Sequence, residues 1–348
     1  MKKIVILKYS AIGDVLRTTA ILPGLKNEFP GSEIYWITEA KSRPVLENNH
    51  FIKKVYLESE LTEHFKKDRF DLIINLDEDY DACQLASELK GKILGYYLEN
   101  GKIVCSQGAK YWMSMSLLGA DNRDELKKAN KETYQKIMYD IIELPYDSDF
   151  SSRLFLTAKE KEFGSSFAKK HKIDFHKDYV VGINSGAGKR WPLKKLEIKK
   201  IVLMINKLID CGLKVILLGG EEEVERNQKI LSLCSSKLVD AGLDNSIREF
   251  ASIINICDSI VTADTLAMHI SISLGKHTLV FFGPTPWHEI EFYGKGEAVF
   301  SNLDCLCCMK KIICEKKPNC MELINEDLII EKILQHKQIS KERVIIDG

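Results

Sequence analysis

The sequence predicts an α/β protein built from two Rossmann-like domains that face a central cleft. Short continuous apolar runs recur along the chain, and each is followed by a loop of small or charged residues and then by apolar positions at helical spacing. Runs of this kind are typical of strands buried on both faces of a parallel sheet. The 348 residues suffice for two domains, and the pattern restarts after a polar stretch near residue 150. We therefore expect domains at residues 1–150 and 151–348.

The expected strands alternate with helical patterns, which indicates βαβ units. In the first half the strands are expected at residues 4–7, 34–37 and 71–76, with a helical pattern at residues 15–22. In the second half they are expected at residues 179–184, 214–218, 259–263 and 277–282. Ligands of open α/β sheets bind beyond the carboxyl ends of the strands, so functional residues are expected in the loops that follow these runs.

The composition limits the partners and the location of the protein. Basic and acidic residues number 50 each, so the formal net charge is zero. A nucleic-acid-binding domain usually has a basic excess, and no nucleic-acid partner is expected. The amino-terminal apolar run ends at Lys8 and is too short for a signal peptide, and no stretch approaches the roughly 18 apolar residues of a membrane span. We expect a cytoplasmic protein, attached at most peripherally to the inner face of a membrane.

The first loop after a strand ends in Gly13 and Asp14. Gly13 permits a tight turn or the close approach of another group to the backbone, and Asp14 stands where a helix should begin. Aspartate is a favoured helix N-cap, and so is Ser10, so capping is the alternative to a functional role for Asp14. The loop lacks the G-x-G-x-x-G fingerprint of dinucleotide-binding sites.

The loop at residues 184–192 has the features of an anion site. It combines small residues, among them Ser185 and Gly186, with the cation Lys189 and with Pro192, a residue suited to the first position of a helix. Backbone N–H groups, a helix dipole and the charge of Lys189 could together bind a diphosphate. The spacing is not that of a Walker A loop, and an ordinary turn with solvated cations is the alternative.

Two later loops contain further candidates. Glu223 follows a strand and Gly220, and it could accept hydrogen bonds from ribose hydroxyls, although the first turns of helices are often acidic. Asp264 and Thr265 lie where a strand gives way to a helix, so they are either ligands or caps. His269 follows one turn later, as a ligand or as a histidine of the core.

The order of these motifs resembles that of the ADP-heptose:lipopolysaccharide heptosyltransferases, glycosyltransferase family 9. The motifs that carry the resemblance are residues 10–15, 189–192, 263–269 and 282–285. It spans nearly the whole chain, and it implies the GT-B architecture. It also implies an inverting transfer that needs no metal or other cofactor, with a nucleotide-diphosphate sugar, ADP-heptose, as the donor.

The resemblance assigns roles to individual residues. Asp14 matches the general base of the family, and Lys189 matches its phosphate-binding lysine. Asp264 and Thr265 match a pair that contacts the donor, and Glu223 is a looser match on the nucleotide side.

Two features depart from the family pattern. Leu266 replaces the glycine that usually follows the Asp-Thr pair. Residues 75–81, on the acceptor side, are acidic, whereas a phosphorylated acceptor should meet cations. The acceptor is therefore left open among a glycan, a lipid and a protein.

Half of the ten cysteines fall between residues 305 and 320. Cys305, Cys308, Cys314 and Cys320 could surround a structural zinc or iron ion, because four thiolates can form a tetrahedral set. Free thiols are the alternative. A catalytic metal is not expected here, since four thiolates leave no open coordination position.

Two other functions remain compatible with the expected fold. A sugar-nucleotide epimerase also has two Rossmann-like domains, but it would need paired acid and base groups acting on the sugar ring, and the loops contain no such pair. A non-catalytic relative that serves in binding or assembly is the second alternative, and Leu266 favours it.

Overall fold

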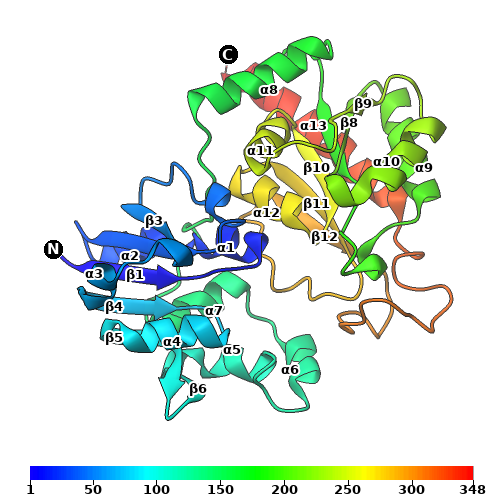
Figure 1. Cartoon of the computed structure of the whole chain (residues 1–348). Helices are drawn as coiled ribbons and strands as arrows, with labels where there is room; N and C mark the ends of the chain where they lie inside the picture. The colour runs from blue at the N-terminus through cyan, green and yellow to red at the C-terminus, as the bar shows by residue number, and fades with distance from the viewer. Residues whose placement is uncertain (348) are drawn as a thin grey trace. The chain divides into compact units, whose positions relative to one another are not determined.

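The computed structural model describes residues 1–347, with side chains described up to residue 340, and it contains two α/β units (Figure 1). The first unit comprises Met1–Phe155 and His288–Tyr293, and the second comprises Leu156–Trp287 and the chain from Gly294 onward. The short segment from the second half joins the first unit through backbone pairing, since the N–H of Tyr134 donates to the carbonyl of Glu289 at 3.0 Å. The expected α/β fold class is confirmed.

The sheet of the first unit has the strand order β3-β2-β1-β4-β5-β6. Its strands are β1 (Lys3–Leu7), β2 (Glu33–Thr38), β3 (Lys54–Leu57), β4 (Arg69–Asn75), β5 (Lys90–Glu99) and β6 (Lys102–Cys105). Neighbouring strands are parallel except β5 and β6, which form an antiparallel pair at the edge. The helices of this unit are α1 (Ile12–Thr18), α2 (Ile21–Glu28), α3 (Glu63–Lys67), α4 (Tyr80–Glu88), α5 (Lys110–Met115), α6 (Arg123–Ala129) and α7 (Tyr134–Ile141).

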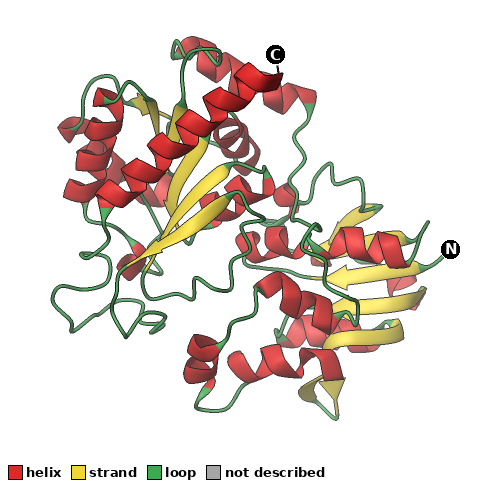
Figure 2. Cartoon of the chain, turned by 180° about the vertical axis from the view of Figure 1, so that it is seen from behind, coloured by secondary structure: helices red, strands yellow, loops and turns green. Residues whose placement is uncertain are grey.

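The second unit repeats this plan with the strand order β12-β11-β10-β7-β8-β9, all parallel. Its strands are β7 (Val180–Asn184), β8 (Lys214–Leu218), β9 (Val239–Asp240), β10 (Ser259–Ala263), β11 (His277–Phe282) and β12 (Gly296–Phe300). Its helices are α8 (Ala158–Lys170), α9 (Ile198–Asp210), α10 (Val224–Leu233), α11 (Ile247–Asn255), α12 (Leu266–Ser273) and α13 (Glu326–Asp347), and Figure 2 shows α13 lying across its sheet. Because β7 lies between β8 and β10, the loops that leave these strands emerge together at one edge of the sheet.

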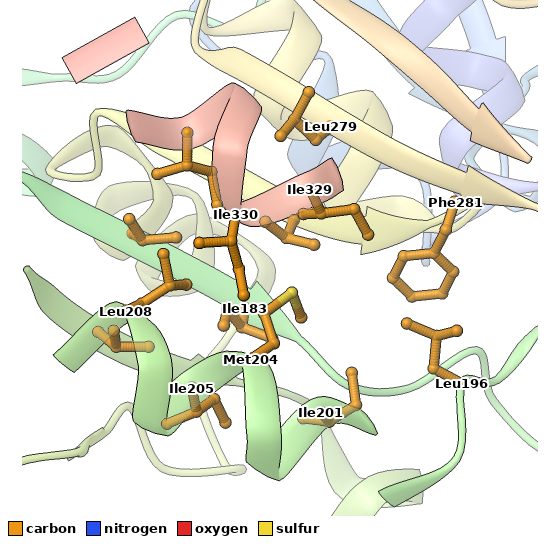
Figure 3. Close-up of a cluster of buried hydrophobic side chains, with 14 of the residues drawn as sticks. Ile183, Leu196, Ile201, Met204, Ile205, Leu208, Leu279, Phe281, Ile329 and Ile330 are labelled. Atoms are coloured by element: carbon orange, nitrogen blue, oxygen red, sulfur yellow. The ribbon is translucent and has the colours of Figure 1, made fainter. Parts of the chain in front are cut away.

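Each unit has its own apolar core. In the second unit one face of α9 packs with α13 and with the sheet (Figure 3). The residues involved include Ile201, Met204, Ile205 and Leu208 from α9, Ile329 and Ile330 from α13, and Ile183, Leu279 and Phe281 from the strands. The α9 residues follow the i, i+3, i+4, i+7 spacing of a single helical face. In the first unit, Val5, Leu7 and Ile73 of the sheet are clustered with Ala82 and Leu85 of α4.

The single helix expected from the pattern at residues 15–22 is wrong, because α1 ends at Thr18 and α2 begins at Ile21. At the break, the N–H of Thr19 and its hydroxyl both donate to the carbonyl of Leu16, at 3.1 and 2.7 Å. Pro23 has no N–H to donate to the carbonyl of Thr19. Pro23 lies in the first turn of α2, where backbone N–H groups have no carbonyl acceptor within the helix. Its missing N–H therefore costs no helical hydrogen bond.

Candidate active site

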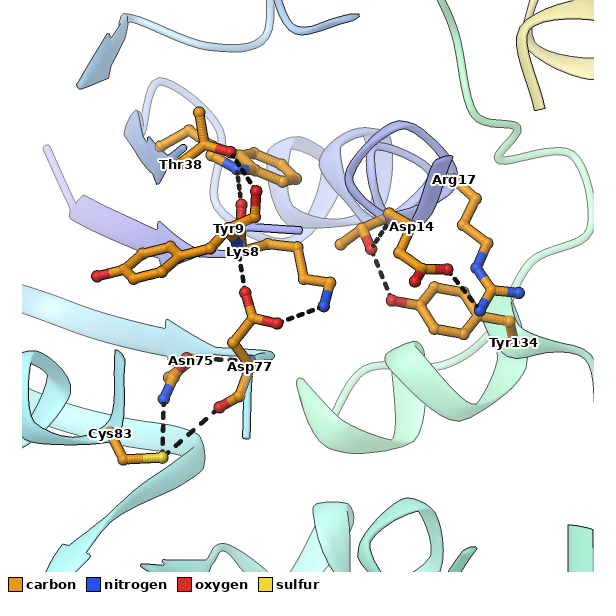
Figure 4. A network of polar contacts seen from close by, with 11 residues as sticks. Lys8, Tyr9, Asp14, Arg17, Thr38, Asn75, Asp77, Cys83 and Tyr134 are labelled. Carbon is orange, nitrogen blue, oxygen red and sulfur yellow. Dashed lines mark hydrogen bonds and ion pairs between the residues drawn. The ribbon is translucent and has the colours of Figure 1, made fainter. Parts of the chain in front are cut away.

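Asp14 lies in the first turn of α1, just beyond the carboxyl end of β1. The N-cap of this helix is Ala11, and no side chain caps it, so neither Ser10 nor Asp14 acts as the cap. Instead, a carboxylate oxygen of Asp14 lies 2.8 Å from the guanidinium of Arg17, one turn further on (Figure 4). The Asp14 side chain is 36% exposed and that of Arg17 is 12% exposed. The carboxylate is therefore accessible to solvent while a nearly buried cation holds it.

Arg17 is itself fixed by Tyr134 of α7 (Figure 4). The guanidinium carbon lies 3.5 Å from the centroid of the Tyr134 ring. The hydroxyl of Thr18 donates to the backbone carbonyl of Asp14 at 2.6 Å and accepts from the hydroxyl of Tyr134 at 2.7 Å. Burial raises the pKa of Tyr134 and keeps its ring neutral. Asp14 thus belongs to a preorganised polar cluster within the first unit.

The acidic stretch at residues 75–81 presents less charge than its sequence suggests. Asp77 is buried and accepts from the ammonium of Lys8 at 2.6 Å, and its other oxygen accepts from the backbone N–H of Tyr9. Burial alone would lower the pKa of Lys8, but Asp77, Tyr134 and Asp14 together outweigh it and raise the pKa. Burial also raises the pKa of Glu78. The exposed acids are Asp79 and Asp81.

In the second unit, Asn184 joins the loop after β7 to the loop after β10. Its side-chain amide lies 3.3 Å from the carbonyl of Gly186, 3.2 Å from the hydroxyl of Thr262 and 3.4 Å from that of Thr265. Thr265 is the N-cap residue of α12, but its side chain makes no capping bond. The structure thereby brings two of the expected donor-binding positions, Gly186 and Thr265, to the same edge of the sheet.

Glu223 holds the loop at residues 184–192 in place through hydrogen bonds to backbone N–H groups. Its two carboxylate oxygens accept from the N–H groups of Gly188 at 3.2 Å and of Gly220 at 3.1 Å, and its side chain is buried. The neighbouring Glu222 accepts from the N–H of Lys189 at 2.9 Å. Glu223 therefore positions this loop, rather than standing open to a ribose as its place after a strand suggested.

Ser185 is also engaged inside the unit, since its hydroxyl donates to the side chain of Asn227 on α10 at 2.5 Å. Lys189, by contrast, is exposed at the turn of the loop. The helix expected to begin at Pro192 is only a one-turn 3-10 helix, Pro192–Lys194, and α9 does not begin until Ile198. A helix dipole is therefore not available at Pro192, and the anion-binding features that remain are backbone N–H groups and the charge of Lys189.

Asp264 pairs with a lysine that the sequence did not single out. The ammonium of Lys194 lies 2.7 Å from a carboxylate oxygen of Asp264 and 3.1 Å from its backbone carbonyl. Burial alone would raise the pKa of Asp264, but Lys194 and the nearby His269 outweigh it and lower the pKa to about 2. His269 is buried on α12, in the turn that follows Thr265. Asp264 is therefore an ion-paired carboxylate and not a helix cap.

The cysteine segment is attached to the turn after β11. The N–H groups of Cys307 and Met309 donate to the carbonyls of Gly283 and Pro284, at 3.2 and 2.8 Å. Burial raises the pKa of Cys320 to about 11, and the neighbouring thiols of Cys308, Cys314 and Cys305 add to this effect.

The structure does not support the metal expected at these cysteines. Among the side chains that the structure describes, up to residue 340, no three from His, Cys, Asp or Glu are placed so that they could hold a metal ion. Cys320 instead packs against the apolar core of the second unit, next to Gly283. No disulfide joins the cysteines in the described part of the chain.

Substitution of Gly186 by alanine is expected to destabilise the second unit by about 1–3 kcal/mol, the usual cost of overpacking. A Cβ atom at this position would lie 2.2 Å from the carboxyl group of Glu223. The Glu223 side chain, which accepts hydrogen bonds from Gly188 and Gly220, would therefore have to move. Urea unfolding would measure the change. Gly212→Ala is a poor control because its φ is +76°, whereas Gly220→Ala is a suitable one, since its nearest neighbour would be 3.8 Å away. Equal stability of Gly186→Ala and the unsubstituted protein would contradict the expectation.

Comparison with known proteins identifies a family for this chain. The sequence model of a family described as "Glycosyltransferase family 9 (heptosyltransferase)" matches residues 60–318. A lipooligosaccharide heptosyltransferase 2 from Haemophilus influenzae is 24% identical over 303 residues, covering 81% of this chain and 83% of the relative. A protein of the same name from Campylobacter jejuni is 26% identical over 172 residues, and the match spans 44% of this chain and only half of that relative.

Two solved structures share the fold over almost the whole chain. The glycosyl transferase family 9 protein from Veillonella parvula has a TM-score of 0.75 at 19% identity, covering 97% of this chain and 96% of that one. The E. coli ADP-heptose lps heptosyltransferase II has a TM-score of 0.69 at 16% identity, covering 98% and 100%. Among the described residues, no helix has both the length and the apolar character needed to cross a membrane.

Proposed function

This chain belongs to glycosyltransferase family 9, and we propose that it transfers a heptose from ADP-heptose to a hydroxyl group of a cell-surface glycan, lipid or protein. The names of its relatives, lipooligosaccharide heptosyltransferases and an ADP-heptose lps heptosyltransferase, favour a glycan of the lipopolysaccharide type among these acceptors. Membership of a glycosyltransferase family favours sugar transfer over the epimerase and the non-catalytic alternatives.

The observation that carries the proposed mechanism is the partly exposed carboxylate of Asp14, held at 2.8 Å by Arg17. We propose that Asp14 removes the proton of the acceptor hydroxyl while that oxygen attacks the anomeric carbon of the donor. The bond from this carbon to the diphosphate oxygen breaks on the opposite face, so the configuration inverts and ADP leaves. Asp14 carries the proton when transfer is complete and releases it to solvent.

The loops of the second unit are proposed to bind the donor. Lys189 and the backbone N–H groups of the loop at residues 184–192 would stabilise the charge that grows on the departing diphosphate. Such donors can take over the task of a metal ion, so the proposed transfer requires none. Ser185, Gly186 and Glu223 would hold this loop in its conformation. Asp264, Thr265 and His269 would line the neighbouring side of the donor-binding site.

The proposal is tested by incubating the purified protein with ADP-heptose, with and without a heptose-deficient lipopolysaccharide acceptor. We expect ADP to be released only when the acceptor is present, together with an acceptor that has gained one heptose. Release of an altered sugar nucleotide would indicate epimerisation, and no reaction with any acceptor class would indicate a binding protein. Either of these results would overturn the proposal.

Arg17 is proposed to position the base, and Arg17→Met should lower kcat roughly a hundredfold, the cost of misplacing a reacting group by about 1 Å. The KM for ADP-heptose should change little, because Arg17 lies in the first unit and the proposed donor-binding loops lie in the second. Arg17→Lys should recover part of the loss, since it restores the charge but not the planar stack on Tyr134. A similar loss of kcat in Arg123→Met, whose side chain is 38% exposed on α6, would show that the effect is not specific to Arg17.

A further inference from the structure

A long loop connects β12 to α13 and extends from the second unit as the orange trace of Figure 1. Its outer part, residues 309–318, is here called the basic finger. At its centre Ile312 and Ile313 are 70% and 73% exposed. Two adjacent aliphatic side chains at this exposure are unusual on a protein surface, where large apolar groups side by side mark an interaction site.

Lysines flank this apolar pair on both sides. Residues 310–317 contain four lysines, Lys310, Lys311, Lys316 and Lys317, and a single acid, Glu315. All four lysines are exposed. The ammonium of Lys317 lies 3.3 Å from Glu322, but its side chain remains 76% exposed. Because the whole chain has a net charge of zero, the positive charge of the finger is a local property.

The base of the finger is held in place. The N–H of Met309 donates to the carbonyl of Pro284, and the carbonyl of Lys311 accepts from the N–H of Leu193 at 3.3 Å. The ammonium of Lys311 also lies 5.3 Å from the centroid of the Trp191 ring. On the far side, the N–H of Asn319 donates to Glu322 at 3.0 Å. The exposed isoleucines are therefore presented from a fixed base.

We propose that the basic finger docks the enzyme on an anionic phospholipid surface. Ile312 and Ile313 would enter the boundary between head groups and acyl chains, and the lysines would lie against lipid phosphates. An apolar centre between clustered lysines is the pattern that binds membrane interfaces. A soluble anion would satisfy the lysines but would leave the two isoleucines in water, so a lipid surface fits the finger better. The docking involves none of the residues proposed to act in transfer.

Co-sedimentation of the full chain with phospholipid vesicles tests this inference. We expect binding to vesicles of phosphatidylethanolamine with phosphatidylglycerol and little binding to pure phosphatidylcholine. Binding should weaken as salt shortens the screening length from about 10 Å at 0.1 M to about 3 Å at 1 M. Ile312→Ser/Ile313→Ser should weaken it roughly tenfold or more through the loss of apolar insertion, and Lys310→Gln/Lys316→Gln should weaken it and flatten the salt dependence.

Leu233→Ser is the matched control, because this residue is 53% exposed at the end of α10 in the same unit and should not affect vesicle binding. Binding of ADP by each variant shows that the unit is folded. Failure of the unsubstituted protein to bind anionic vesicles would overturn the inference, and so would undiminished binding by the isoleucine variant. Self-association that the isoleucine variant abolishes, without any vesicle binding, would instead identify the finger as an interface between copies of the chain.

Discussion

Asp14→Asn is expected to abolish measurable sugar transfer. General-base catalysis contributes roughly 100- to 10,000-fold to a rate, and kcat should fall by at least that factor. The amide has the size and shape of the carboxylate and can still accept a hydrogen bond from Arg17, which lies 2.8 Å from Asp14. It cannot take the proton of an acceptor hydroxyl. The cluster of Arg17, Thr18 and Tyr134 should remain intact, so stability should change little.

The measurement is initial-rate formation of glycosylated acceptor, combined with calorimetric binding of ADP. Binding should match that of the unsubstituted protein, because the proposed nucleotide contacts lie in the second unit. Asp124→Asn serves as a control, since Asp124 lies on α6 of the same unit with a side chain that is 67% exposed. Undiminished turnover in Asp14→Asn would assign the removal of the proton to another group.

The sequence was most informative where strands are buried on both faces. The runs expected at residues 214–218, 259–263 and 277–282 coincide with β8, β10 and β11, all of which are almost entirely buried. Such strands must be apolar along their whole length, so they are visible as continuous runs. The strands β3 and β6 are partly exposed and only 4 residues long, so their apolar runs are too short to indicate a strand. Those strands were not predicted.

The loops that follow β1, β7, β8 and β10 were singled out from the sequence because ligands of open α/β sheets bind beyond the carboxyl ends of the strands. The contacts within these loops were not predicted. The partners within them were missed, since Lys194 meets Asp264 across 70 residues of sequence and Glu223 meets Gly188 across 35. Spacing in the sequence contains no signal for such pairs. The spacing of Cys305, Cys308, Cys314 and Cys320 suggested a metal site, but among the described side chains no three His, Cys, Asp or Glu are placed so that they could hold a metal ion.

Lys194→Met is expected to be among the most destabilising single substitutions in the second unit. The side chains of Lys194 and Asp264 are only 13% and 20% exposed, so the methionine would leave a carboxylate largely shielded from water without its cation. Removing one partner of a buried ion pair costs about 3–5 kcal/mol. Urea unfolding at neutral pH, followed by tryptophan fluorescence, should show a loss of this size.

The pH dependence of this loss identifies its cause. The pKa of Asp264 is lowered to about 2 in the folded protein, whereas an aspartate in an unfolded chain has a pKa of about 3.9. A carboxyl group whose folded pKa is depressed stabilises the fold above its unfolded pKa, and this contribution disappears as the pH falls through the folded pKa. The difference in stability between the unsubstituted protein and Lys194→Met should therefore be full above about pH 5 and shrink toward pH 2.

The double variant Lys194→Met/Asp264→Asn separates the charge from the packing. It removes the carboxylate together with its cation, so no uncompensated charge remains, and it should recover most of the stability lost in Lys194→Met at neutral pH. Because replacing both partners of a buried pair is often close to neutral whereas removing one is not, the recovery is the decisive observation. If the double variant were as unstable as Lys194→Met at every pH, the role of Lys194 would lie in the packing of its aliphatic chain on Trp191, over which its ammonium lies at 4.9 Å.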